Sequence, residues 1–144
     1  MPLLNSVAKI VTKPVPRVIS PGGHAVFDYI TVGSFWMSAV WFWQRSKRAA
    51  LAAFICGGAE LALSLLTDYP GGVKRVISFR RHGEIDLGLA AMTATIPEFL
   101  AFKDDHERKF FLVQGALITA VTELTQFPDK GRGAEKNMKR AKAA

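Results

Sequence analysis

The chain has 144 residues, of which 49% are hydrophobic, yet 19 Lys and Arg against 12 Asp and Glu give it a formal net charge of +7. This length indicates one domain, and the single cysteine, Cys56, excludes an intrachain disulfide framework or a thiolate metal cluster. The first residues, MPLLNSVAKIVTK, lack the basic start and the cleavage site of a signal peptide, so we expect them to be retained.

The hydrophobic residues collect into four blocks, and the charged residues collect between them. The blocks cover residues 24–43, 49–66, 85–102 and 110–127, and none of them contains Lys or Arg. Each is close to the roughly 20 residues that cross the hydrocarbon core of a bilayer. The helices of a soluble bundle would show a charged face, which these blocks lack. The predicted fold class is therefore all-α, an integral membrane four-helix bundle that forms a single transmembrane domain.

The distribution of basic residues predicts the orientation of the four spans. Thirteen Lys and Arg lie on one side of such a membrane, and six lie on the other side, in the turns 44–48 and 103–109. The positive-inside rule then places both termini in the cytoplasm, which predicts a multi-pass protein of the bacterial inner membrane. At the end of the first block, Trp41 and Trp43 are typical of residues at the membrane–water interface.

The C-terminal segment 129–144 carries six basic and two acidic side chains. We interpret this segment as a basic cytoplasmic tail that contacts anionic lipid. No aromatic residue lies among its charges, so a nucleic-acid partner is not expected. The segment VKRVISFRR is both basic and apolar, and we expect it to lie among the lipid headgroups, with its arginines, Arg75, Arg80 and Arg81, contacting phosphates and its apolar side chains in the lipid.

One phrase of the sequence occurs twice. RVISPGGHAVFD covers residues 17–28, and RVISFRRHGEID covers residues 75–86, so that each residue of the second copy follows its counterpart by 58 residues. The match continues without a gap, which predicts a first repeat at about 15–70 and a second at about 73–128. Two spans in each repeat give both repeats the same orientation, so we expect a pseudo-two-fold axis along the membrane normal.

Two segments resemble the SPW-repeat family of small bacterial integral membrane proteins. TATIPEFLAFKDD is similar to the setting of the Ser-Pro-Trp motif of that family, with Ile96-Pro97-Glu98 in its place, and LLTDYPGGVKRVISFRRHGEIDLGLA resembles the connecting segment. Of the motif itself only Pro97 is present, and the first repeat has Ala39-Val40-Trp41. The resemblance implies units of two spans and implies no particular activity.

Each copy of the repeated phrase places a His and an Asp four residues apart, as His24 with Asp28 and His82 with Asp86. On a helix this spacing brings both side chains to one face. Ionisable groups inside a membrane are costly and need a reason. One interpretation is structural: serine caps at Ser20 and Ser78 begin the helices. In it, Asp28, Asp86 and Glu84 pair with the two histidines and with Arg75, Arg80 and Arg81.

Two other interpretations of these pairs remain open. His24 and His82 could ligate one haem iron from both sides, or they could bind a divalent metal such as iron or zinc together with Asp28, Asp86 and Glu60. Alternatively, the carboxylates and histidines form part of a proton or ion path, for which Glu98 is the candidate on the far side of the membrane.

Motifs of common enzyme classes are missing, including G-x-S-x-G, H-E-x-x-H, a P-loop and G-x-G-x-x-G. This favours a non-enzymatic accessory, scaffold or partner-binding protein that works as a homo-oligomer or within a larger membrane assembly. The alternative function is a membrane protein that binds haem, a metal, protons or ions at the duplicated His/Asp pairs.

Overall fold

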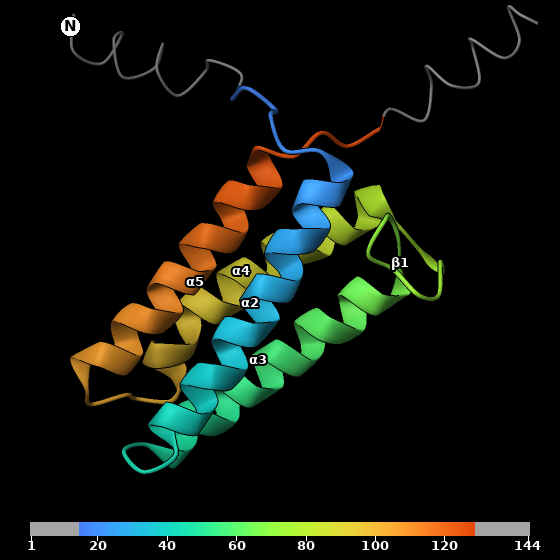
Figure 1. The fold of residues 1–144 in the computed structure, drawn as a ribbon. Helices are drawn as coiled ribbons and strands as arrows, with labels where there is room; N and C mark the ends of the chain where they lie inside the picture. Colours follow the sequence, from blue (N-terminus) through green and yellow to red (C-terminus); the bar gives the residue numbers. More distant parts are fainter. Residues whose placement is uncertain (1–14, 129–144) are drawn as a thin grey trace, which may run out of the picture.

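The computed structural model describes residues 15–128, so the predicted basic tail lies outside the described residues, as do residues 1–14. The chain forms four long helices and two short strands (Figure 1): α2 (Pro21–Phe42), α3 (Lys47–Leu66), β1 (Thr67–Asp68), β2 (Ile77–Ser78), α4 (Phe79–Phe99) and α5 (Asp105–Glu123). The prediction of an all-helical fold is confirmed, and the two strands were not predicted.

Serine residues are the N-caps of three helices, α2, α3 and α4. The Ser20 hydroxyl accepts a hydrogen bond from the Gly23 N–H at 3.1 Å, and the Ser78 hydroxyl accepts one from the Arg81 N–H at 3.4 Å. Both predicted caps are therefore confirmed. Helix α4 begins at Phe79, earlier than the apolar block that starts at residue 85, because the cap lies before a polar first turn.

The helices form two hairpins, α2 with α3 and α4 with α5, and the contacts within each hairpin are the most extensive in the bundle. Glycines permit the close approach. A Cβ atom at Gly57 would lie 2.6 Å from the Trp36 ring, and one at Gly115 would lie 2.8 Å from the carbonyl oxygen of Ala90. Small residues at these positions allow the helix backbones to come together, as the sequence predicts.

Short parallel backbone pairings tie the end of each hairpin to the beginning of the other. Thr67 pairs with Ile77 between β1 and β2, and Ile19 pairs with Thr125 in an isolated bridge. As a result, the starts of α2 and α4 and the ends of α3 and α5 lie together (Figure 1). We call this the terminal end of the bundle, and we call the opposite end, with the turns 43–46 and 100–104, the hairpin end.

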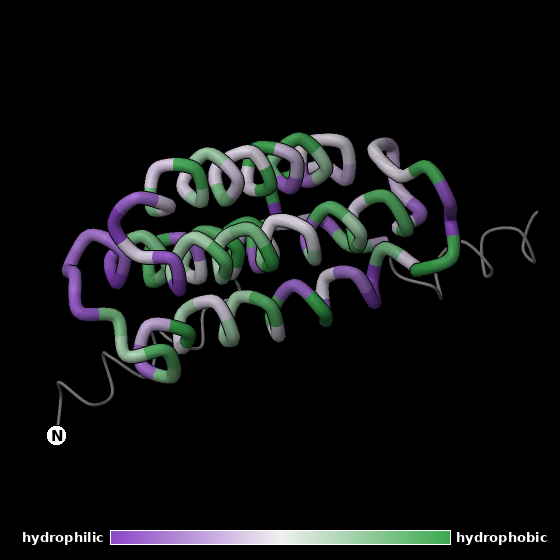
Figure 2. Tube along the Cα trace, turned by 90° about the horizontal axis from the view of Figure 1, so that it is seen from below, coloured by the Kyte–Doolittle hydropathy of each residue, from purple (hydrophilic) through white to green (hydrophobic). Residues whose placement is uncertain are grey.

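Two of the four helices are long and apolar enough to cross a membrane by length and composition. They are α2, with a mean hydropathy of 1.2, and α3, with a mean hydropathy of 1.9. Hydrophilic residues gather mainly in the turns at the two ends (Figure 2). Between the ends, the largest hydrophobic cluster packs around Phe35, Phe42 and Phe111, which are at most 4% exposed. The polar cluster described next lies at the terminal end.

Candidate metal centre

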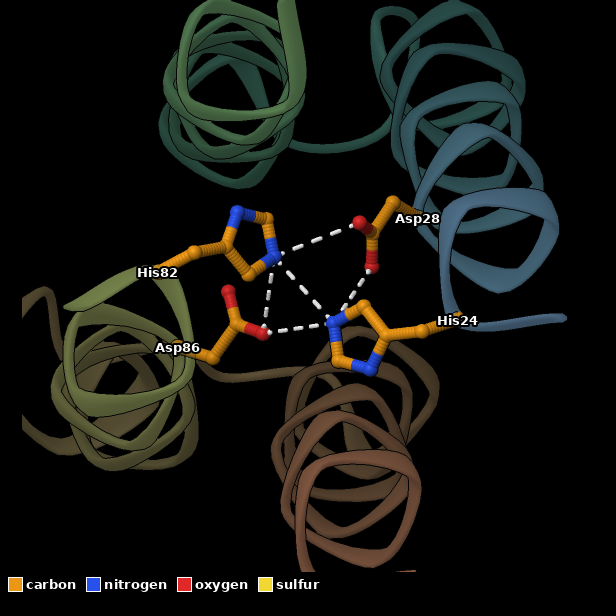
Figure 3. A group of neighbouring side chains, drawn as sticks. All are labelled: His24, Asp28, His82 and Asp86. Carbon is orange, nitrogen blue, oxygen red and sulfur yellow. Dashed lines mark hydrogen bonds and ion pairs between the residues drawn. The ribbon is translucent and has the colours of Figure 1, made fainter. Parts of the chain in front are cut away.

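Four ionisable side chains meet inside the bundle near its terminal end. His24 and Asp28 come from the first two turns of α2, and His82 and Asp86 come from the first turns of α4. All four are buried, with exposed fractions of 0% for both histidines, 4% for Asp28 and 1% for Asp86. Figure 3 shows the two His/Asp pairs pointing toward one another across the bundle, which is the arrangement that the metal interpretation requires.

The side chains meet through the Nε2 atoms of the histidines and the carboxylate oxygens. The two Nε2 atoms lie 3.1 Å apart. Oδ2 of Asp86 lies 3.1 Å from each of them. The two oxygens of Asp28 divide between the rings, with Oδ1 3.3 Å from Nε2 of His24 and Oδ2 3.3 Å from Nε2 of His82. These short contacts surround one point.

Two threonines fix the opposite side of each imidazole ring. Nδ1 of His24 lies 2.7 Å from the hydroxyl of Thr125, and Nδ1 of His82 lies 2.7 Å from the hydroxyl of Thr67. Each hydroxyl donates its own proton to a backbone carbonyl one turn earlier, that of Val121 for Thr125 and that of Leu63 for Thr67. The threonine oxygens can then only accept, so both rings carry a proton on Nδ1.

The position of this proton determines whether Nε2 of each ring donates or accepts. A neutral imidazole has one N–H, and here it is on Nδ1, so Nε2 of both His24 and His82 presents a lone pair. Two lone pairs facing each other at 3.1 Å, beside two carboxylates, repel one another. One proton on either Nε2 would form a hydrogen bond between the two rings but leave one negative charge without a counter-charge, and protons on both would balance the charge but point two N–H groups at each other. A divalent cation between them would accept all the lone pairs and also balance the two carboxylates.

The spacing agrees with tetrahedral coordination. Zinc binds imidazole nitrogen and carboxylate oxygen at about 2.0–2.1 Å, and a regular tetrahedron of that size has edges of about 3.3–3.4 Å. The Nε2–Nε2 and Nε2–carboxylate separations, 3.1 to 3.3 Å, are close to these edges, and one ligand atom from each of the four residues lies within 4.8 Å of the others. The donor set of two imidazoles and two carboxylates therefore fits a small divalent transition metal.

Aromatic rings cover the cluster toward the terminal end of the bundle. The rings of Phe79 and Phe127 lie 5.2 and 6.0 Å from that of His24, and the ring of Tyr69 lies 5.2 Å from that of His82. Phe79 was predicted to insert into lipid, and this prediction is wrong, because its side chain is 5% exposed and packs against the histidine. Together the rings shield the cluster from solvent.

Tyr69 and Phe127 stand at matching positions of the two repeats. Because only Tyr69 has a hydroxyl, the two aspartates differ in their hydrogen-bond partners. The Tyr69 hydroxyl donates to Oδ2 of Asp28 at 2.7 Å. Burial and this hydrogen bond to a carboxylate raise the pKa of Tyr69 well above its ordinary value, so the phenol remains a donor. Phe127 has no hydroxyl to offer, and Oδ1 of Asp86 is buried without a hydrogen-bond partner among the described residues.

Glu60, the fifth predicted metal ligand, does not join the four converging side chains. Its side chain is 2% exposed and lines a small cavity of about 10 Å³, together with Asp28, Asp86 and Thr122. Glu60 lies on α3, nearly two turns before the helix ends, so it is further from the terminal end than the histidines. Of the five residues in the metal interpretation, the structure therefore brings four together and leaves Glu60 out of the set.

The geometry does not fit the haem interpretation. Axial histidines bind iron from opposite faces of the porphyrin, which must lie between them. Here His24 and His82 are only 3.1 Å apart at Nε2, and carboxylate oxygens occupy the space beside both nitrogens. The far-side residue of the ion-path interpretation, Glu98, is paired with Arg108 at the hairpin end.

Of the predicted pairs between an arginine and an acid, only that of Arg80 with Glu84 occurs among residues 15–128. Arg75 pairs with Asp68 at 3.4 Å, and Arg80 pairs with Glu84 at 4.0 Å, all of them exposed at the terminal end. In the structural interpretation these arginines were expected to help neutralise the buried aspartates, but no such pair occurs among residues 15–128. Within that part of the chain, the histidines are the only basic side chains that pair with Asp28 and Asp86.

No family model, curated protein or solved structure matches this chain.

Sequence reasoning missed four residues of the centre: Thr67, Thr125, Tyr69 and Thr122, whose hydroxyl donates to Oδ2 of Asp86 at 3.3 Å. The repeat contained a signal for two of the threonines, since Thr67 and Thr125 stand at matching positions of the two repeats, as do the two histidines. Their role was not predicted because each of these two threonines contacts the histidine of the other half of the chain, 15 or 101 residues away.

Proposed function

We propose that the chain is a four-span membrane protein in which a divalent transition metal, best matched by Zn²⁺, binds to His24, Asp28, His82 and Asp86. The observation that carries the proposal is that the two histidine Nε2 atoms lie 3.1 Å apart, with carboxylates on both sides. The Nδ1 proton of each ring is held by a threonine hydroxyl, so both Nε2 lone pairs face the space between the rings. Imidazole and carboxylate ligands with four-fold coordination are typical of zinc.

The proposed role of the metal is to join the two hairpins. Each hairpin supplies one His/Asp pair, and all four ligands are protein side chains, which is typical of a structural rather than a catalytic zinc site. In this interpretation the protein is a non-enzymatic scaffold or accessory subunit, and the metal fixes the relative position of its helices. The ligands of one repeat match those of the other, as do the supporting threonines, and this supports a tandem repeat with a pseudo-two-fold axis.

A membrane location is supported by the large apolar side chains on the outside of the bundle. On α2, Met37 and Val40 are 76% and 78% exposed, and on α3, Phe54 and Ile55 are 59% and 64% exposed. Large apolar side chains exposed to this extent are unfavourable in water and suit a bilayer. We further propose that both termini are cytoplasmic, with Arg75, Arg80 and Arg81 at the headgroups, and that Trp41 and Trp43 mark the opposite interface.

Elemental analysis tests the metal proposal on protein extracted from membranes with detergent. We expect one zinc, or one competing transition metal such as iron, for each chain. Membranes washed with alkaline carbonate should retain the protein. If the extracted protein carries no metal and takes none up when Zn²⁺ is supplied, the His/Asp cluster is a purely structural set of proton-mediated pairs.

The threonines provide a sharper prediction. Thr67→Val and Thr125→Val remove the acceptor for Nδ1–H and allow the imidazole to rotate or change tautomer. We expect each to weaken Zn²⁺ binding about 10–100-fold, measured by competition with a chelator of known affinity, because residues that orient metal-bound histidines have effects of that size. Thr→Ser at the same positions keeps the hydroxyl and should restore most of the affinity.

Thr119→Val is the matched control for these variants. The Thr119 hydroxyl also donates to the carbonyl one turn earlier, that of Gly115, but contacts no histidine. If Thr119→Val weakens Zn²⁺ binding as strongly as Thr67→Val, the effect reflects helix packing, and the assigned tautomer loses its support.

A further inference from the structure

A second polar site lies at the hairpin end, opposite the metal centre. It is a pocket of about 330 Å³ between the turn that joins α2 to α3 and the turn that joins α4 to α5. Both turns are at the lower left of Figure 1. The charged and polar side chains that line the pocket are Arg45, Ser46, Arg48, Lys103, Asp104 and Glu107. None of them belongs to the proposed metal site.

Glu107 is the unusual member of this set. Its side chain is 1% exposed, and neither carboxylate oxygen has a hydrogen-bond partner among residues 15–128. The nearest cation is Arg45, whose Nε lies 3.5 Å from Oε1 without forming a hydrogen bond. A buried carboxylate without hydrogen bonds is costly. The pocket therefore contains an acceptor that suits a ligand with several N–H donors.

Arg45 is already engaged by another carboxylate. Its Nη2 donates to Oδ2 of Asp104 at 2.7 Å, and this pair connects the two turns. The backbone N–H of His106, and then the Arg45 guanidinium, lower the pKa of Asp104 below its usual range, so Asp104 remains ionised. The short hydrogen bond of Arg45 therefore goes to Asp104, and Glu107 has only the longer ion pair with the same guanidinium.

Two further cations, Arg48 and Lys103, line the same pocket. The guanidinium of Arg48 reaches only the backbone carbonyl of Leu100, at 3.5 Å, which leaves most of its donors without a protein partner among the described residues. Guanidinium and ammonium groups are the usual partners of phosphate. The pocket thus combines a buried carboxylate with two cations of the kind that bind phosphate. This combination suits a ligand that carries a positive group for the carboxylate and a phosphate for the cations.

We propose that this pocket binds the headgroup of a phospholipid with a primary ammonium group, of the phosphatidylethanolamine class. The ammonium donates to Glu107, and the phosphate accepts from Arg48 and Lys103. A primary ammonium has three N–H donors for the two carboxylate oxygens, whereas the trimethylammonium of phosphatidylcholine has none. Phosphatidylglycerol has the phosphate but no cation for Glu107.

The position of the pocket agrees with a lipid ligand. It lies where helices end, and the predicted interface aromatics Trp41 and Trp43, 68% and 46% exposed, are at the same end of the bundle. Headgroups lie at this level of a bilayer. The inference rests on the membrane location in the proposed function but is independent of the metal, so either can fail alone.

Lipid binding to the purified full-length protein in detergent provides the test, using native mass spectrometry with lipids of identical acyl chains. We expect phosphatidylethanolamine to bind about tenfold more tightly than phosphatidylcholine, because a hydrogen bond to a charged group contributes about that factor. Glu107→Gln should abolish this preference, whereas Arg48→Gln should weaken the binding of both lipids. Thermal unfolding without lipid verifies that each variant is folded.

Asp105→Asn is the matched control, since Asp105 precedes Glu107 in the same helical turn but is exposed and pairs with Lys109. It should retain the preference for phosphatidylethanolamine. Equal binding of the two lipids by the wild-type protein, or an unchanged preference in Glu107→Gln, would overturn the proposal. Soluble phosphoethanolamine should compete only at much higher concentration, and if it binds as tightly as the lipid, the site serves a free phosphoamine and the lipid assignment is wrong.

Discussion

Replacing either histidine of the proposed centre with alanine is expected to lower the affinity for Zn²⁺ by more than about 100-fold. Residues that merely orient a ligand have effects of about 10–100-fold, and the loss of a ligand removes a coordination bond directly. His24→Ala and His82→Ala should have similar effects, because each Nε2 lies 3.1 Å from one aspartate and 3.3 Å from the other. Competition with a chelator measures the change.

His106→Ala is the control for the histidine variants. His106 is the third histidine of the chain, and its side chain is 77% exposed at the hairpin end beside Asp104. Its replacement should leave Zn²⁺ binding unchanged. Equal affinities in wild type, His24→Ala and His106→Ala would show that zinc binds elsewhere or non-specifically.

The second large effect concerns stability. A ligand that binds only the folded state at about 100 times its dissociation constant stabilises that state by about 2.7 kcal/mol. For a domain of this size that corresponds to a rise in Tm of roughly 5–10 °C. We expect Zn²⁺ to produce such a rise in chelator-treated wild-type protein, followed by differential scanning fluorimetry in detergent, because the metal joins side chains of α2 and α4.

Two comparisons make the stability measurement specific. Mg²⁺ prefers six oxygen ligands and should not raise Tm at the same concentration. The double variant Asp28→Asn, Asp86→Asn should lose the response to Zn²⁺, because it removes both carboxylates. A Zn²⁺-dependent rise that persists in this variant would contradict a site made of these four residues.

Local patterns in the sequence were enough to predict the helices and to identify the His/Asp pairs as candidates, whereas the convergence of the pairs was left open. Apolar blocks and serine caps are local features, and the caps at Ser20 and Ser78 form as predicted. The repeated phrase placed His24 and His82 at matching positions, which raised the question of whether they meet. The membrane location, the orientation and the resemblance to SPW-repeat proteins stay predictions.

Features that depend on contacts distant in sequence were not predicted. Glu60 was grouped with the metal ligands because depth along a helix can be estimated from sequence, whereas the direction of its side chain relative to α2 and α4 cannot. Glu107 was interpreted as part of a polar turn, since a charged residue between apolar blocks is usually solvated. Its burial results from the docking of two turns that are far apart in the chain.

The most direct measurement of the central proposal is X-ray absorption spectroscopy of zinc bound to the full-length protein. We predict four nitrogen or oxygen ligands at about 2.0 Å, with the outer-shell scattering of two imidazole rings, and the loss of one imidazole contribution in His24→Ala. A spectrum with six oxygen ligands and no imidazole scattering would contradict a metal centre formed by His24, Asp28, His82 and Asp86.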